Sequence, residues 1–262
     1  MKELETLRVE EDGGVMSITL DRPSVHNAFN DELIAEAIEL FEAIDERRDL
    51  RAVVLRSDGK NFCAGADLNW MSEMVDYSRE ENIRDSAQLA KMFALMNECS
   101  VPIVGRIQGA AIGGGVGLVA VCDVVIAEAG ARFGLSEVKL GILPAVISPY
   151  VIRKIGESHA RALFLTGERF DAQRALRIGL VHRIADGLDE LDRLVEKTVG
   201  ELRTSGPEAV RHCKSLVDYV SHHPIEDSIT YTIDAIADRR VSEEGQEGMG
   251  SFLRKEKPSW VE

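Results

Sequence analysis

Two loops of small residues in this sequence could each bring backbone N–H groups close to a ligand. In residues 62–68 (FCAGADL), four small residues in succession allow a close approach of the backbone, and Asp67 can cap a following helix. In residues 109–117 (GAAIGGGVG), glycines lead into a helix whose first N–H groups have no partner within the helix. Such donors can bind an anion, or a carbonyl oxygen that gains negative charge.

A third candidate is Glu137, the one carboxylate in the apolar stretch at residues 133–141 (FGLSEVKLG). A carboxylate held in apolar surroundings can accept a proton from a reacting group and return it. Each of these three signals also has an ordinary structural interpretation. The loops could be tight turns or closely packed helix starts, and the glutamate could be a solvated side chain.

The glycine segment also contains a partial match to the dinucleotide-binding fingerprint, at residues 115–120 (GVGLVA), with alanine in the last place. In that fold the glycines follow a strand directly, and a full helix then separates them from the next strand. Here the expected helix, residues 118–121, ends just before Asp123 and a strand predicted at 124–127. That helix is too short for a crossover, so we set this interpretation aside.

The overall composition favours a globular protein that binds neither nucleic acid nor an anionic membrane. The chain has 262 residues, 45% of them apolar, and a formal net charge of −14, which repels phosphate backbones. Four widely spaced cysteines form no metal-binding or disulfide pattern: Cys63, Cys99, Cys122 and Cys213. Since no signal peptide and no bilayer-spanning apolar run is seen, we expect a cytoplasmic protein without a metal site.

Apolar runs predict the strands and helices that position these loops. Strands are expected at residues 15–20, 52–55, 101–107 and 124–127. A helix is expected where apolar residues recur between Leu33 and Ile44, and the segment 69–99 is expected to be largely helical. Strand, loop and short helix recur at modest intervals, which indicates stacked ββα units in an α/β fold.

The last third of the chain has a helical pattern. It begins at Glu157 and continues almost to the end, and Pro207 and Pro224 stand where new helices could begin, near N1. We therefore divide the chain into a core, residues 1–200, and an all-helical C-terminal region, residues 201–262.

In their joint order, the motifs resemble those of the enoyl-CoA hydratase/isomerase (crotonase) superfamily over nearly the full length. The matching segments are 22–23 (RP), 27–28 (NA), 62–68, 109–123, 133–144, 165–168 (LTGE) and 172–181. The resemblance implies the crotonase (ClpP/crotonase-like) fold, an α/β spiral of ββα repeats with a C-terminal helical trimerisation region. It also implies an acyl-CoA substrate, no separate cofactor, and a homotrimer or dimer of trimers. Residues 67–71 (DLNWM) and 144–150 (PAVISPY) look most similar to methylglutaconyl-CoA hydratases of leucine degradation.

The same resemblance implies catalytic roles for three residues. The backbone N–H groups of Ala66 and Gly114 would bind the thioester oxygen, and Glu137 would move protons at the adjacent carbons. Typical hydratases of the family carry a second glutamate where this chain has Gly117. Methylglutaconyl-type hydratases are similar in having glycine there. Two interpretations of Gly117 stay open: close helix packing, or an acyl pocket widened by the missing side chain for a branched or carboxylated group.

Three functions stay open from the sequence. Hydration of an α,β-unsaturated acyl-CoA comes first, and Δ3,Δ2-enoyl-CoA isomerisation by the single glutamate comes second. A non-catalytic or RNA-associated binding role is a third, which the acidic charge disfavours.

Further residues are implied to contact the substrate. His26 is expected to be a contact and not a base, and Phe252 and Lys255 are expected to reach CoA, often that of a neighbouring subunit. Trp70, Met71 and Met74 are expected either to wall the acyl pocket or to pack in a helix core. The full set implied to bind substrate is His26, Ala28, Ala64, Ala66, Asp67, Leu68, Gly114, Gly117, Phe252 and Lys255.

Overall fold

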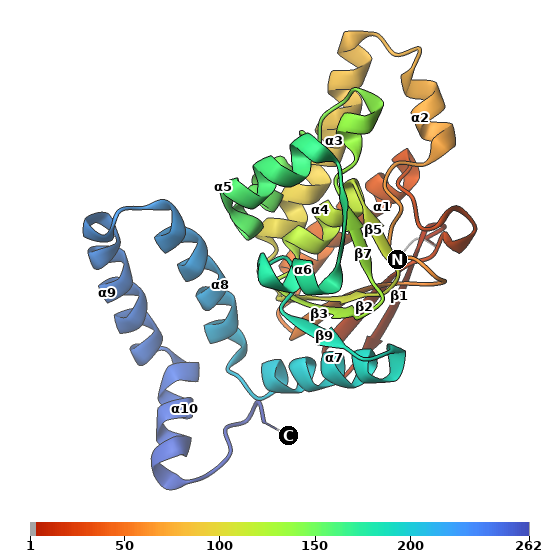
Figure 1. Cartoon of the computed structure of the whole chain (residues 1–262). Coiled ribbons are helices and arrows are strands. Elements are labelled where there is room, and N and C mark those ends of the chain that lie inside the picture. The colour runs from red at the N-terminus through yellow and green to blue at the C-terminus, as the bar shows by residue number, and fades with distance from the viewer. Residues whose placement is uncertain (1–3, 262) are drawn as a thin grey trace.

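Residues 4–261 are described by the structure, a computed structural model (Figure 1). A six-stranded sheet runs through the core in the order β1-β2-β3-β4-β6-β9. β1 and β2 are antiparallel and the other neighbours are parallel. The strands are β1 (Leu7–Asp12), β2 (Val15–Leu20), β3 (Ala52–Ser57), β4 (Ile103–Ile107), β6 (Val124–Glu128) and β9 (Arg183–Ala185).

A second, three-stranded sheet has the order β5-β7-β8. β5 and β7 are parallel, and β8 is antiparallel to β7. β5 and β7 lie in the chain between strands of the larger sheet, so the chain moves repeatedly from one sheet to the other. The bounds are β5 (Ala110–Ile112), β7 (Arg132–Gly134) and β8 (Arg169–Asp171).

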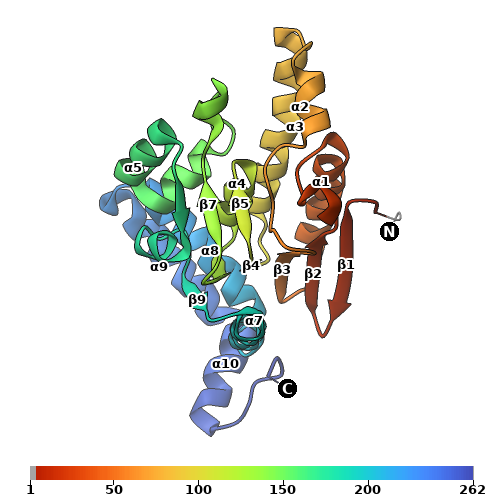
Figure 2. The ribbon, with the colours of Figure 1, turned by 45° about the vertical axis from the view of Figure 1, so that its right-hand side comes forward.

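Helices cover both faces of the six-stranded sheet. On one face, one buried residue from each of five strands packs with Leu191, Val195 and Val199 of α7. The other face packs on α1, α3 and α4 in the larger apolar core (Figure 2). The bounds are α1 (Asp31–Glu46), α2 (Leu68–Met74), α3 (Arg79–Glu98), α4 (Gly114–Val121), α5 (Ser148–Thr166), α6 (Ala172–Arg177) and α7 (Leu188–Arg203), with short 3-10 turns η1 (Pro23–Val25) and η2 (Glu137–Leu140).

The C-terminal region forms a helical arm that extends away from the core, as Figure 1 shows. It consists of α8 (Pro207–His222), α9 (Ile225–Val241) and α10 (Glu243–Arg254). Arg211 of α8, only 4% exposed, holds the arm to the core by donating to Ser100 Oγ at 2.5 Å and to the carbonyl of Arg47 at 2.6 Å. Hydrogen bonds from a buried guanidinium are among the stronger ones in proteins, so the base of the arm is well fixed.

The structure confirms the α/β class and most predicted elements, and it corrects others. The continuous helical pattern from Glu157 is wrong, because α5 begins at Ser148 and two short strands, β8 and β9, interrupt the helices. α4 begins at Gly114, four residues earlier than expected. Pro207 is the first residue of α8 and Pro224 is the N-cap residue of α9, next to N1, so both prolines stand at helix starts as predicted. No helix within residues 4–261 is both long and apolar enough to cross a membrane.

Candidate active site

The two small-residue loops lie against each other, as the site requires. Cys63 N donates to the carbonyl of Ala110 at 3.0 Å, and Ile112 N donates to the carbonyl of Cys63 at 2.9 Å. A Cβ atom placed on Gly115 would lie 2.5 Å from that same Cys63 oxygen. Because backbone cannot give way easily, only glycine allows the start of α4 to approach the loop this closely.

Ala66 and Gly114 both present free N–H groups at this junction. Within residues 4–261, neither N–H donates to a protein acceptor. Gly114 is the first residue of α4, where helix geometry provides no acceptor for the N–H. Asp67, next to Ala66, is the N-cap of α2 and accepts Asn69 N at 2.8 Å, as the sequence predicted. The junction can therefore donate to a ligand oxygen.

Glu137 lies over the residue that caps α4. It follows β7 and begins η2, and a Cβ atom placed on Gly113 would lie 3.0 Å from its Oε1. Gly113 has φ +53° and donates its N–H to the carbonyl of Gly134 at 2.8 Å, which ties α4 to β7. An L side chain at Gly113 would be strained and would meet the carboxylate, so glycine is needed there. The fold brings the third candidate of the sequence to the other two.

The side chain of Glu137 is half-buried. Its Oε2 is buried and has no hydrogen-bond partner in the described part of the chain. Burial raises the pKa of Glu137, because the charged form loses its hydration. A desolvated carboxylate without a partner is a stronger proton acceptor than a solvated one, which suits general acid–base chemistry.

The surroundings of Gly117 favour close helix packing over a widened pocket. A Cβ atom placed there would lie 2.4 Å from Ile147 Cγ2 and 2.9 Å from Phe93 Cε1. Gly117 and both neighbours are buried. The space that a second glutamate would need is filled by these two side chains, so Gly117 serves close helix packing.

We expect Gly117→Glu to destabilise the fold without increasing hydration of crotonyl-CoA. Overpacking against Ile147 and Phe93, together with a buried charge, should cost about 3 kcal/mol or more in the free energy of unfolding. Urea unfolding and an enoyl-CoA assay measure the two effects. Gly200→Glu, in open space on α7, is the matched control and should be no less stable than the wild type, because glutamate favours helix more than glycine does. Increased hydration by a stable Gly117→Glu enzyme would contradict this interpretation.

The loop at residues 22–30 supports the small-residue loop. Ala64 N donates to the carbonyl of His26 at 3.0 Å, and exposed His26 also contacts Asn61 Nδ2 through its ring nitrogen at 3.1 Å. Arg22 donates to the carbonyl of Ala28 at 2.5 Å and to Asp67 Oδ2 at 2.9 Å. Ala28 and Asp67 are therefore engaged in structural contacts; substrate contacts by these residues stay predictions.

Arg22 and Asn27 are supporting residues to which the sequence alone assigned no role. Asn27, 1% exposed, donates from Nδ2 to the carbonyls of Asp58 at 2.8 Å and Asn61 at 2.9 Å. It also accepts Arg22 N at 2.9 Å. Both residues belong to the RP and NA segments that matched the family in the sequence. Their hydrogen bonds hold the neighbouring loops in place.

The remaining predicted contacts lie at the edge of the site or outside it. Leu68, two residues after Ala66, is 80% exposed. Trp70 is buried in the apolar core and donates to Asp85 at 3.2 Å, which favours the helix-core interpretation. Phe252, 82% exposed, and Lys255 belong to the end of α10, on the arm away from the core (Figure 1). Contacts of these two residues with CoA, including the CoA of a neighbouring subunit, stay predictions.

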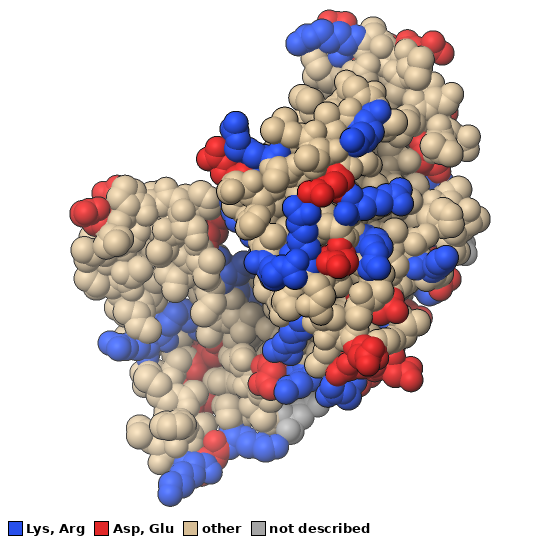
Figure 3. Space-filling model, viewed as in Figure 1, with Lys and Arg blue, Asp and Glu red and all other residues tan. Residues whose placement is uncertain are grey.

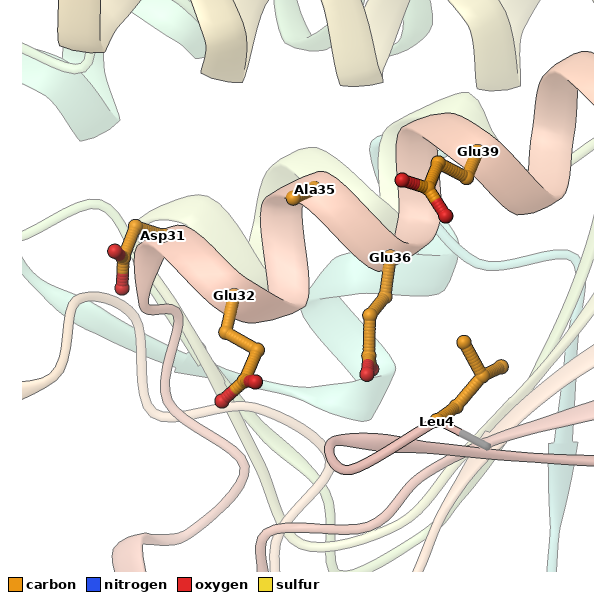
Figure 4. Close-up of a pocket in the computed structure, with 6 residues that line it drawn as sticks. All are labelled: Leu4, Asp31, Glu32, Ala35, Glu36 and Glu39. Atoms are coloured by element: carbon orange, nitrogen blue, oxygen red, sulfur yellow. The ribbon is translucent and has the colours of Figure 1, made fainter. Parts of the chain in front are cut away.

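Two surface hollows lie elsewhere, and neither is lined by the three catalytic candidates. One, of about 250 Å³, lies along α1 and is shown in Figure 4; its carboxylates would repel the phosphates of CoA. It is lined by Leu4, Asp31, Glu32, Ala35, Glu36 and Glu39. The other, of about 570 Å³, lies by α6 and the strands of the smaller sheet, where Figure 3 shows a cluster of basic side chains. It is lined by Arg132, Arg169, Phe170, Asp171, Arg174 and Arg177.

Comparison with known proteins identifies the family. A family model described as enoyl-CoA hydratase/isomerase matches residues 10–262. A solved enoyl-CoA hydratase of Shewanella pealeana is 39% identical with a TM-score of 0.94, covering 99% of this chain and 97% of that one. The solved Pseudomonas aeruginosa protein AtuE is 36% identical with a TM-score of 0.95, covering 98% and 100%. A short-chain-enoyl-CoA hydratase of Clostridium acetobutylicum is 29% identical over 97% of both chains.

The crotonase-type fold predicted from the sequence is thereby confirmed, including its C-terminal helices. The family model covers the segments that carry Ala66, Gly114 and Glu137, together with the arm. The chain therefore belongs to the enoyl-CoA hydratase/isomerase family of enzymes.

Proposed function

We propose that this enzyme adds water to an α,β-unsaturated acyl-CoA. The thioester oxygen binds between the N–H groups of Ala66 and Gly114, and Glu137 lies beside the α- and β-carbons. One observation carries the proposal: Glu137, whose buried Oε2 has no protein partner among residues 4–261, lies with its Oε1 against Gly113, the residue that caps α4, where N–H donors are free. A buried carboxylate oxygen without a partner lowers the stability of the fold. Groups of this kind are typical of catalytic sites.

The reaction needs only these groups and water. Ionised Glu137 accepts a proton from water as the water oxygen bonds to the β-carbon. The electron pair of the double bond moves toward the thioester oxygen, where the two N–H groups stabilise the enolate. Glu137 then returns the proton to the α-carbon. The dipole of α4 adds to the donor strength of Gly114.

Isomerisation is the second candidate, because the same groups can shift a double bond. Glu137 would take a proton from C2 of a 3-enoyl-CoA and return it at C4, through the same enolate. The packing around Gly117 favours this alternative, since it leaves no room for the second carboxylate of typical hydratases.

An absorbance assay distinguishes the candidates. Hydration of crotonyl-CoA removes the ultraviolet absorbance of the conjugated enoyl thioester, whereas isomerisation of a 3-enoyl-CoA creates it. We expect the first change to be the faster. If neither substrate reacts although a CoA thioester still binds, both catalytic functions are contradicted and a binding-only role remains.

We further propose a branched dicarboxylic acyl group of the 3-methylglutaconyl type as the preferred substrate. Support comes from the sequence segments at 67–71 and 144–150, which lie on α2 and before and within the first turn of α5. The value of kcat/KM for 3-methylglutaconyl-CoA should exceed that for crotonyl-CoA. A preference for the straight chain would contradict the substrate while leaving the reaction intact.

The raised pKa of Glu137 predicts the pH dependence of hydration. The base must be ionised, so kcat/KM should rise with pH through a limb set by Glu137, above the ordinary value of about 4.5. The effect on stability has the opposite direction. Because burial favours the neutral carboxyl group, the contribution of Glu137 to stability is greatest at low pH, where Glu137 is protonated. The free energy of unfolding then falls as pH rises through the raised pKa of Glu137. A pH profile of kcat/KM measures the limb. A limb at or below the ordinary value would disagree with a desolvated base.

We also propose that copies of this chain pack through the helical arm, as a trimer or a dimer of trimers. The arm exposes ten large apolar side chains, more than a lone soluble surface usually carries in one region. Figure 3 shows much of the visible arm as uncharged surface. The ten are Val217, Val220, Ile225, Ile229, Ile233, Ile236, Val241, Met249, Phe252 and Leu253. Light scattering of the full chain tests this state, and a monomer would contradict it.

A further inference from the structure

Phe29 connects the two loops that carry the proposed N–H donors. Its own N–H donates to the carbonyl of Gly65 at 2.7 Å, and its carbonyl accepts Asp67 N at 2.8 Å. These two bonds enclose Ala66, which forms an isolated parallel bridge with Phe29. The backbone of Phe29 therefore determines where the N–H of Ala66 lies.

The ring of Phe29 determines the position of the other donor. A Cβ atom placed on Gly114 would lie 2.7 Å from Phe29 Cε2 and 3.1 Å from Cδ2. The start of α4 thus rests directly on the edge of the ring, at a distance that no side chain on Gly114 would permit. The backbone of one residue holds the first donor while its side chain supports the second.

The ring of Phe29 is buried and packs against an aromatic side chain of α3. Phe29 is only 2% exposed. It packs edge-on against Phe93 of α3, with ring centroids 6.2 Å apart and planes at 61°. Phe93 in turn packs against Tyr150 of α5, at 5.9 Å. Because buried aromatic pairs at close packing density move little, Phe29 cannot withdraw from Gly114 without displacing two helices.

The geometry points to Phe29 as a positioning residue that sets the separation of the Ala66 and Gly114 N–H groups. This inference rests on the proposed function, since it needs both groups to bind one thioester oxygen. Hydrogen bonds to a developing oxyanion require donors about 2.7–3.1 Å away. A misplacement of about 1 Å costs on the order of 10²-fold in rate, so a residue that fixes both donors has a large effect without touching the substrate.

Phe29→Leu tests the inference, because it keeps the backbone bonds and an apolar side chain but removes the ring edge. We expect kcat to fall between about 10-fold and about 100-fold with a much smaller change in KM. A spectroscopic readout follows the donors directly. When a conjugated dienoyl-CoA is bound, hydrogen bonds to its carbonyl move its absorbance to longer wavelength, and this shift should be smaller in the variant.

Phe41→Leu is the matched control. Phe41 is also 2% exposed, but it belongs to the core face of α1 and contributes to neither loop. It should lose similar stability in thermal unfolding while keeping the kcat and the absorbance shift of the wild type. Phe29→Met, which conserves more volume, provides a second variant should Phe29→Leu fold poorly, and it should show the same two losses.

The outcomes separate the two claims. If wild-type enzyme turns over neither enoyl-CoA nor 3-enoyl-CoA, the proposed function fails, whatever Phe29 does. If wild type is active and the folded Phe29 variants keep its kcat and absorbance shift, the positioning role is overturned. An equal loss in Phe41→Leu would also overturn it, since the effect would then be one of general stability.

Discussion

Replacing Glu137 with glutamine is expected to lower hydration of an enoyl-CoA by about 10²- to 10⁴-fold, because an amide cannot accept and return the proton. The fold should survive. The carboxylate has a buried oxygen without a partner, and its charged form is disfavoured by burial, so the thermal midpoint should equal or exceed that of the wild type. Loss of the enoyl thioester absorbance measures the rate.

Glu157→Gln provides the control for this change. Glu157 lies on α5 in an exposed pair with Arg161 at 3.6 Å, with 79% of its side chain exposed. Surface pairs of this kind contribute little, so both rate and stability should stay at wild-type values. Full activity of Glu137→Gln would show that this carboxylate is not the base of the reaction.

Replacing Gly114 with alanine is expected to lower kcat by about 10²-fold, although the N–H group itself is kept. The added Cβ would lie 2.7 Å from Phe29 Cε2, a ring packed on Phe93, so the start of α4 must move instead. The donor then leaves the position where charge develops on the thioester oxygen, and loss of one such donor costs about 10²–10³-fold. Steady-state kinetics with the same substrate measure the change.

The matched glycine for this experiment is Gly200, inside α7, where a Cβ would meet nothing within 4 Å. Gly200→Ala should leave activity unchanged and raise stability by about 0.5–1 kcal/mol, because alanine favours helix. Wild-type kcat in a folded Gly114→Ala enzyme would show that this N–H does not bind the reacting oxygen.

Local sequence patterns predicted the longer elements, whose apolar residues recur at regular spacing within the element. The apolar positions between Leu33 and Ile44 predicted α1, and Asn30 caps it by accepting Leu33 N at 3.0 Å. The alternation at 15–20 predicted β2 with its observed bounds. α1 buries one face, and β2 places Met16, Ile18 and Leu20 together in the larger apolar core, so the spacing of their apolar residues can be read from consecutive positions.

Short elements stabilised by distant partners could not be predicted in this way. β5 has three residues within the glycine segment, and it pairs with β7 and with Cys63. β8 and β9 are equally short and stand inside a helical pattern. Three residues show no periodicity, and their hydrogen bonds go to strands far away in the chain, so only the assembled sheets define them.

The sequence alone determined which chemical groups are present: two loops able to offer backbone donors, one carboxylate in an apolar stretch, and the order of motifs that marks the family. The tertiary structure decided how they act. It places the half-buried Glu137 beside Gly113, fills the space at Gly117 with Ile147 and Phe93, and places Phe29 between the two donors. Burial and contact distance depend on residues from many parts of the chain, and no local pattern encodes them.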